Sequence, residues 1–199
     1  MLAVTGGKGG VGKTTTALGI AAVLARGGRR PIVVDADIDL PDLARVAGVP
    51  DGSLRRLADG APLSAAPTVA GVTVVGAADD ATPADLRCVL DRLASQSRRV
   101  VVDCPAGVGT PHGFALRAAT EALLVTRPTR QAVTDALRTG TLARRLGATP
   151  RRVAVTGTRH IPTGFDRTLL PPATSVPAPG RTPPWRGDTS VYEPLRDGL

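Results

Sequence analysis

Short apolar runs alternate with longer segments of helical periodicity along this chain. Apolar runs with charged or polar residues only at their ends occupy 2–4, 31–35, 99–103, 121–126 and 151–156. Such runs are typical of strands in a parallel sheet that helices cover on both faces. Between them, residues 14–26 are apolar on nearly all sides, and helical patterns also follow Thr82 and span 128–146. The order predicts a doubly wound α/β fold with a mainly parallel sheet.

The rest of the chain gives weaker signals. Residues 43–67 are predicted to form short helices and turns, and 69–76 a modest strand. From Pro162 onward eight prolines exclude a long helix, although 174–177 could add an edge strand. We expect one domain over 1–199 with a Pro-rich irregular segment from about 162 to 199.

Composition narrows the class of protein. Aromatic residues make up 2% of the 199 residues, so Val, Leu, Ile and Ala must build the core. Cys88 and Cys104 form no C-x-x-C motif and are both predicted to be small buried residues. The N-terminus has no leader-like pattern, no apolar run approaches bilayer length, and the tail lacks a membrane-anchoring amphipathic helix. A cytoplasmic protein is expected.

The net charge of +8 is compatible with weak, non-specific binding to DNA. The arginine pairs are nevertheless dispersed, mostly where a helix ends or a strand is about to begin. Cations are favourable at helix C-termini, which gives a simpler explanation of the same pattern. Both interpretations stay open.

The richest chemistry lies in the glycine-rich loop between the first strand and the first helix. Gly7 to Thr14 fits the phosphate-binding pattern G-x-x-x-x-G-K-[ST], with backbone N–H groups and a helix N-terminus to surround phosphates. Lys13 provides a point charge for the β- and γ-phosphates, and the Thr14 hydroxyl suits Mg²⁺. The expected nucleotide-binding residues of this loop are Gly7, Gly9, Gly10, Val11, Gly12, Lys13, Thr14 and Thr15.

Lys8 makes this loop more specific. The string from Lys8 to Thr15 resembles the deviant Walker A motif of the MinD/ParA family of P-loop ATPases. The resemblance implies that Lys8 reaches across a two-fold interface to the partner's nucleotide. Lysine occurs only at positions 8 and 13, and the other 23 of the 25 basic residues are arginine. This usage indicates that a compact ammonium is required at both places.

Two further segments resemble the switch regions of that family. Asp35 to Asp42 holds four carboxylates at the end of a strand. The resemblance implies that Asp35 holds a water of the Mg²⁺ shell and that Asp37 orients or deprotonates the attacking water. Asp39 and Asp42 depart from the family, which often has glycine and asparagine there; Asp42 fits better as the cap of the next helix.

The strand at 99–103 ends in Asp103, as a Walker B motif does, and this carboxylate can reach Mg²⁺ through its water shell. The predicted metal residues are therefore Thr14, Asp35 and Asp103. Cys104 to Gly107 resembles the second switch, in which a backbone N–H approaches the γ-phosphate. The asparagine that usually reads adenine is absent from 155–159, and His112, His160 and Trp185 are treated as structural or exposed.

The resemblance implies a Mg-ATP-dependent homodimer with slow, partner-stimulated hydrolysis, in which Lys8, Lys13 and Asp37 act in catalysis. Such a protein is a positioning or partitioning switch with a protein partner. Two alternatives remain at this point: a nucleotide-binding interaction module with little turnover, and a carrier ATPase for metal or iron–sulfur clusters. The lack of paired cysteines disfavours the carrier.

Overall fold

An eight-stranded sheet forms the centre of the molecule. The computed structural model describes residues 1–7, 9–161, 171–178 and 182–196. The strand order is β3-β4-β2-β5-β1-β6-β7-β8, and every pair is parallel except β3 with β4. The strands are β1 (Leu2–Thr5), β2 (Ile32–Asp35), β3 (Thr68–Val69), β4 (Val72–Val75), β5 (Val100–Asp103), β6 (Glu121–Thr126), β7 (Thr149–Thr156) and β8 (Ala173–Val176).

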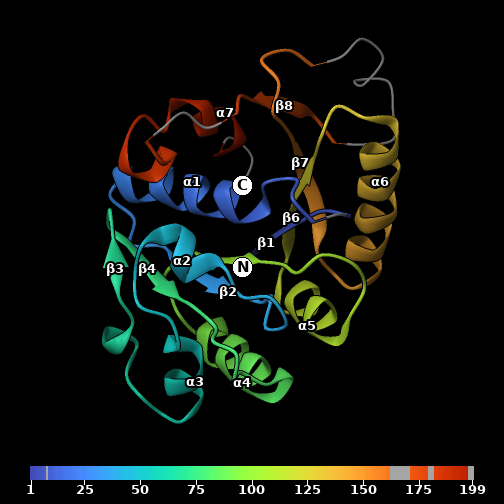
Figure 1. Ribbon diagram of the computed structural model, residues 1–199. Helices are drawn as coiled ribbons and strands as arrows, with labels where there is room; N and C mark the ends of the chain where they lie inside the picture. Colours follow the sequence, from blue (N-terminus) through green and yellow to red (C-terminus); the bar gives the residue numbers. More distant parts are fainter. Residues whose placement is uncertain (8, 162–170, 179–181, 197–199) are drawn as a thin grey trace.

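Helices cover both faces of this sheet (Figure 1). One face packs against α1, α2 and the C-terminal elements, and the other packs against α3, α4 and α5. The helices are α1 (Lys13–Arg26), α2 (Leu43–Ala47), α3 (Ser53–Ala58), α4 (Pro83–Ala94), α5 (Thr110–Ala118), α6 (Arg130–Arg145) and α7 (Glu193–Arg196), with short 3-10 turns η1 (Leu63–Ala65), η3 (Pro184–Arg186) and η4 (Ser190–Tyr192). The doubly wound, mainly parallel α/β prediction is confirmed.

The central strands are apolar throughout because they contribute to two separate cores. Val33 and Val101 pack in the core around α1, whereas their neighbours Val34 and Val102 pack in the core beneath α4 and α5. Successive side chains of a strand point to opposite faces, so a strand covered on both sides has no polar alternation. Each of these four valines has no exposed surface.

Local signals placed the helix ends well. Thr82 caps α4 with a reciprocal capping box, in which its hydroxyl accepts from the Asp85 N–H and the Asp85 carboxylate accepts from the Thr82 N–H. Gly27 caps α1, and Gly28 follows with φ +80°, a conformation that favours glycine. The predicted edge strand near 174–177 is also confirmed, as β8.

Two local expectations were wrong. Cys88 is exposed, because it lies on the solvent side of α4; Cys104 is buried as predicted. A two-residue strand, β3, pairs antiparallel with β4, where no hairpin was expected. The buried residues of α6 are mostly small, namely Ala132, Ala136, Thr139, Gly140 and Ala143. Small residues let this helix approach the sheet and the glycine-rich loop closely.

The described part of the C-terminal segment packs on α1. Tyr192 and Leu195 are 1% and 0% exposed and belong to the α1 core. An added Cβ at Gly19 would lie 2.5 Å from the Tyr192 ring, so this aromatic ring rests directly on the α1 backbone. No helix in the described ranges is long and apolar enough to cross a membrane.

Replacing Tyr192 should therefore destabilise the whole domain. We expect Tyr192→Ala to lower the free energy of unfolding by about 3–5 kcal/mol, the range for removing a large buried aromatic side chain. Urea denaturation measures the change, with the partly buried neighbour Val191→Ala as a control that should cost much less. If the two variants are equally stable, Tyr192 does not hold the C-terminal segment on α1.

Candidate functional site

A cavity of about 500 Å³ opens at the carboxyl edge of the sheet. Its walls come from the glycine-rich loop, the loops after β2 and β5, and the ends of β6, β7 and β8. Ligands of open α/β sheets bind at this edge. The predicted residues Gly9, Gly10, Val11, Gly12, Lys13, Thr14, Thr15 and Asp37 all line the cavity, whereas Gly7, Asp35, Asp103 and Gly107 are not part of its lining.

The glycine-rich loop joins β1 to α1 as the sequence predicted. Gly10 and Gly12 have φ values of +72° and +93°, which side-chain-bearing residues rarely adopt. Gly7 is required for another reason, since an added Cβ would lie 2.2 Å from Cβ of Asp135 on α6. The helix begins at Lys13, so its N-terminus opens into the cavity. Lys8 lies outside the described residues.

Asp103 is a buried carboxylate with a strongly raised pKa beneath this loop. It is 2% exposed, and burial raises its pKa to about 7, against the opposing effects of a hydrogen bond from Thr14 and the charge of Lys13. Within the described residues its Oδ1 atom has no hydrogen-bond partner. Asp103 thus keeps a buried acceptor available beside the Thr14 hydroxyl.

Asp35 lies next to Asp103 because the two are register partners in the paired strands β2 and β5. Burial raises the pKa of Asp35 well above its ordinary value, and the neighbouring Asp103 charge adds to that effect. Its two oxygens accept backbone N–H groups of Asp37 at 3.0 Å and Leu43 at 3.1 Å. Asp35 therefore fixes the course of the acidic loop as well as adding charge under the cavity.

The other acidic residues of this loop separate into two environments. Asp37 is half-buried in the cavity wall, and burial raises its pKa, while a hydrogen bond from the Leu40 N–H and the charge of Lys13 act in the opposite direction. Asp39 is exposed. Asp42 is the N-cap residue of α2, but its side chain makes no capping hydrogen bond and pairs with Arg45 at 3.2 Å instead. The capping role expected for Asp42 is therefore wrong.

The turn containing Gly107 is held from below by a buried histidine. His112 in α5 is fully buried, and its Nδ1 bonds to the Gly107 carbonyl while its Nε2 lies 2.8 Å from the Thr5 hydroxyl. A carbonyl only accepts, so Nδ1 bears the proton and, in neutral histidine, Nε2 accepts from Thr5. Burial lowers the pKa of His112, which favours that neutral form. No local motif marks the contact between His112 and Thr5, because 107 residues separate them.

Two more residues at the cavity belong to none of the predicted motifs. Arg127, just after β6, donates through Nη2 and Nε to the Gly10 carbonyl at 3.0 and 3.3 Å. The Thr156 hydroxyl lies 2.6 Å from the Val11 carbonyl and 3.0 Å from the Thr126 carbonyl. Both tie the glycine-rich loop to the ends of β6 and β7, where no motif would mark them.

Comparison with known proteins places this site in a family. Residues 2–168 match the model of the CobQ/CobB/MinD/ParA nucleotide binding domain. The septum site-determining protein MinD of Synechocystis sp. is 33% identical over 149 residues, which cover 68% of this chain and 56% of that protein. This chain therefore spans little more than half the length of that relative.

Solved structures agree with this match. MinD of Pyrococcus horikoshii complexed with Mg-ADP has a TM-score of 0.80 at 27% identity, covering 99% of this chain and 90% of that one. Cobyrinic acid a,c-diamide synthase from Mycobacterium smegmatis, with an ATP analog and magnesium, has a TM-score of 0.73 at 25% identity, covering 98% and 92%. The phosphate-binding loop, the buried Asp103 at the end of β5 and these similarities lead to one conclusion: the chain belongs to the CobQ/CobB/MinD/ParA family of nucleotide-binding proteins.

Proposed function

We propose that this protein is a Mg-ATP-dependent dimerising ATPase of the MinD/ParA type that acts as a slow positioning or partitioning switch. The observation that supports it best is the juxtaposition of an intact phosphate-binding loop with two buried carboxylates, Asp35 and Asp103. The Mg-ADP and ATP-analog complexes of the similar structures make ATP the expected nucleotide. An unidentified protein partner would set the rate.

The site residues fit magnesium. Asp103 Oδ1 is a buried acceptor without a partner in the described part of the chain, and the Thr14 hydroxyl bonds to the same carboxylate. Hydroxyl, carboxylate and water oxygens, together with substrate phosphates, are the ligands that Mg²⁺ prefers. When bound, Mg²⁺ would neutralise phosphate charge. Thr14 would hold it, Asp103 would accept from its water shell, and Asp35 would act from further away.

Hydrolysis would depend on this chain's own charges and acceptors. Lys13 and the loop N–H groups hold the phosphates, and Lys8 would add a second ammonium from the partner protomer. Asp37, in the cavity wall, would orient the attacking water and take its proton. Arg127 and Thr156 would keep the loop in shape around the phosphates.

The dimer would form across the cavity mouth. Leu40 follows β2 and Val108 follows β5, and these two large apolar side chains are 80% and 83% exposed. Both lie in loops at the carboxyl edge of the sheet, beside the cavity that would hold the nucleotide. Exposed apolar side chains of this size gain free energy when a second protomer covers them.

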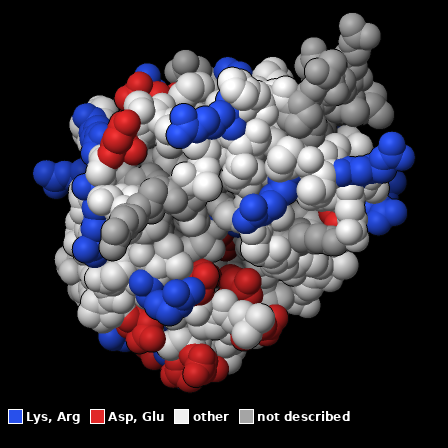
Figure 2. Space-filling view, turned by 45° about the horizontal axis from the view of Figure 1, so that its top comes forward, with Lys and Arg blue, Asp and Glu red and all other residues white. Residues whose placement is uncertain are grey.

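Other expectations remain predictions. Figure 2 shows Lys and Arg in separate groups, not in a continuous basic stripe, on the face it displays. This face therefore adds no support for weak DNA binding. A cytoplasmic location fits the proposed role. The metal-carrier alternative gains no support, because no three His, Cys, Asp or Glu side chains of the described ranges form a metal-binding group. Measuring ATP hydrolysis distinguishes our proposal from the other alternative, an interaction module that binds nucleotide with little turnover.

The carboxylates predict an unusual pH dependence for the protein without nucleotide and Mg²⁺. The Asp103 pKa of about 7 lies above the ordinary 3.8, so the folded state holds a proton that the unfolded chain releases between these values. The free energy of unfolding should therefore fall as pH rises from about 4 to 7 and stay lower above 7. At about 1.4 kcal/mol per pKa unit, the loss is on the order of a few kcal/mol.

Asp103→Asn should remove much of this loss. Urea denaturation at pH 4.5 and pH 8 should show a smaller decrease in stability for this variant than for the wild type. Asp79→Asn, at an exposed position, is the matched control and should behave as the wild type does. Parallel pH profiles for all three proteins would show that Asp103 is not the cause.

Asp37→Ala should bind Mg-ATP normally but hydrolyse it about 100-fold more slowly, because the variant loses the group that orients the water. Asp39→Ala is the matched control, since that exposed carboxylate lies two residues away and outside the cavity lining. Steady-state phosphate release and binding of a fluorescent ATP analogue measure the two quantities separately. Equal rates for the two variants would contradict the role of Asp37.

Lys8→Ala should still bind ATP through Lys13 and the loop but remain monomeric, because the bridging charge is gone. In light scattering with ATP and Mg²⁺, the mass of the wild type should shift from 20.3 kDa toward twice that value, whereas the mass of the variant should not shift. Val108→Ser, which removes an exposed apolar contact, should weaken the dimer without changing nucleotide affinity. A Lys8→Ala protein that dimerises as the wild type does would eliminate the trans-acting lysine.

A further inference from the structure

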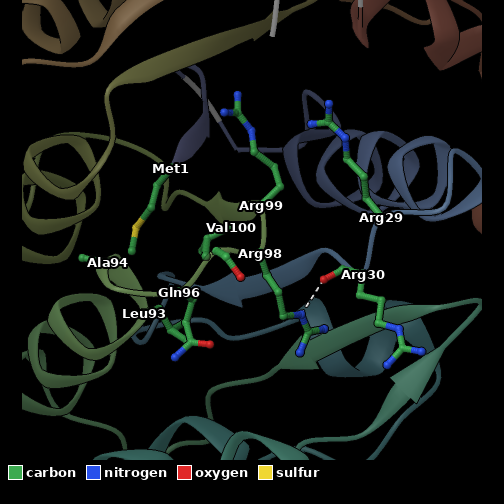
Figure 3. A pocket seen from close by; sticks show the side chains of 10 residues that line it. Met1, Arg29, Arg30, Leu93, Ala94, Gln96, Arg98, Arg99 and Val100 are labelled. Atoms are coloured by element: carbon green, nitrogen blue, oxygen red, sulfur yellow. Dashed lines mark hydrogen bonds between the residues drawn. The ribbon is translucent and has the colours of Figure 1, made fainter.

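Four arginines gather at the end of the sheet opposite the nucleotide cavity. Arg29 and Arg30 precede β2, and Arg98 and Arg99 precede β5, so the parallel pairing of these strands brings the two pairs together. With Met1 they line a second cavity of about 500 Å³ (Figure 3). Figure 3 shows the side chains of Arg29 and Arg99 running in one direction, with Arg98 turned toward Arg30.

The Arg98 guanidinium is fixed in place before any ligand arrives. Its Nε donates to the Arg30 carbonyl at 2.5 Å, and its Nη2 donates to the Thr73 hydroxyl at 2.7 Å and, more weakly, to the Pro31 carbonyl at 3.4 Å. Burial and the Arg30 charge lower the pKa of Arg98. These bonds use Nε and Nη2, and among the described residues Nη1 makes no hydrogen bond, so its donors stay open to an anion.

Positive charge in this group is poorly balanced. The cavity lining contains no acidic residue. Glu121 pairs with Arg99 but is shared with Arg151 at 3.5 Å. Arg29 and Arg30 are exposed, and among the described residues neither forms a salt bridge. A single shared carboxylate therefore opposes four guanidinium groups.

Helix dipoles explain only part of this arrangement. The C-termini of α1 and α4 end near these arginines, and each presents about half a negative charge. Arg144 and Arg145, in the last turn of α6, also stand at a helix C-terminus, but they are exposed and line neither this cavity nor the nucleotide cavity. Charge compensation thus accounts for a basic residue at a helix end but not for four around one cavity.

We propose that this arginine pocket binds an anion containing two or more linked phosphate groups. The planar guanidinium fork matches phosphate oxygens bidentately, and arginine is the preferred residue for such contacts. The two arginine pairs suit more than one phosphate, and the volume lies within the range of small-molecule sites. Linked phosphates come from two sources, a free polyphosphate or the backbone of a nucleic acid.

The test compares two double variants of equal charge. Arg29→Gln with Arg30→Gln alters the pocket, and Arg144→Gln with Arg145→Gln is the matched control at another helix end. All proteins also contain Lys13→Ala, so binding at the phosphate loop contributes little, and failure of the ATPase proposal would not affect the result. Circular dichroism checks that each protein is folded.

Calorimetric titration measures the affinity for tripolyphosphate at low salt. This affinity should fall about tenfold or more in the pocket variant and change little in the control. A second arm uses a short DNA duplex under the same conditions. A pocket-specific loss with tripolyphosphate identifies free polyphosphate as the ligand, and a pocket-specific loss with DNA alone identifies the nucleic-acid backbone. Equal losses in both double variants, or no binding of either probe, would overturn the proposal.

Discussion

Two carboxylates side by side in the interior are the constraint on which this site depends. Asp35 and Asp103 end neighbouring strands in register and are 1% and 2% exposed. Burial raises both pKa values, and the Asp103 charge raises that of Asp35 further, so the pair is costly to ionise. Lys13 and the bonds from Thr14, Asp37 and Leu43 offset part of that cost. A divalent cation would offset more, which couples folding stability to ligand binding.

Buried side chains connect the site to the loops after β2 and β5. Asp35 accepts from two N–H groups of the acidic loop, and thereby fixes where Asp37 and Leu40 stand. On the other side, His112 joins the β1 strand end to the Gly107 turn through two hydrogen bonds. A change in charge at the cavity would act first on these bonds. The exposed Leu40 and Val108 lie on the same two loops, so loop position and dimer contacts would change together.

The two ends of the sheet have opposite chemistry. Carboxylates and backbone N–H groups meet at the carboxyl ends of the strands, whereas arginine pairs collect at the amino ends of β2 and β5. The parallel arrangement produces this division, because every strand except β3 enters from the same end. A basic residue between a helix and the next parallel strand therefore lies at the amino end of the sheet. Where two such strands are neighbours, as β2 and β5 are, their basic residues come together.

The sequence by itself determined the alternation of elements and the glycine-rich loop, and it predicted Asp35, Asp37 and Asp103 as site residues, because these are local patterns. Apolar runs, glycine spacing and the Thr82 capping box each depend on a few neighbouring residues. Only the tertiary structure decided which distant residues meet. Strand order paired Asp35 with Asp103, α6 packed Asp135 against Gly7, and α5 placed His112 under Gly107. It also exposed Cys88 and joined the four arginines in one pocket, since burial and proximity follow from packing rather than from local pattern.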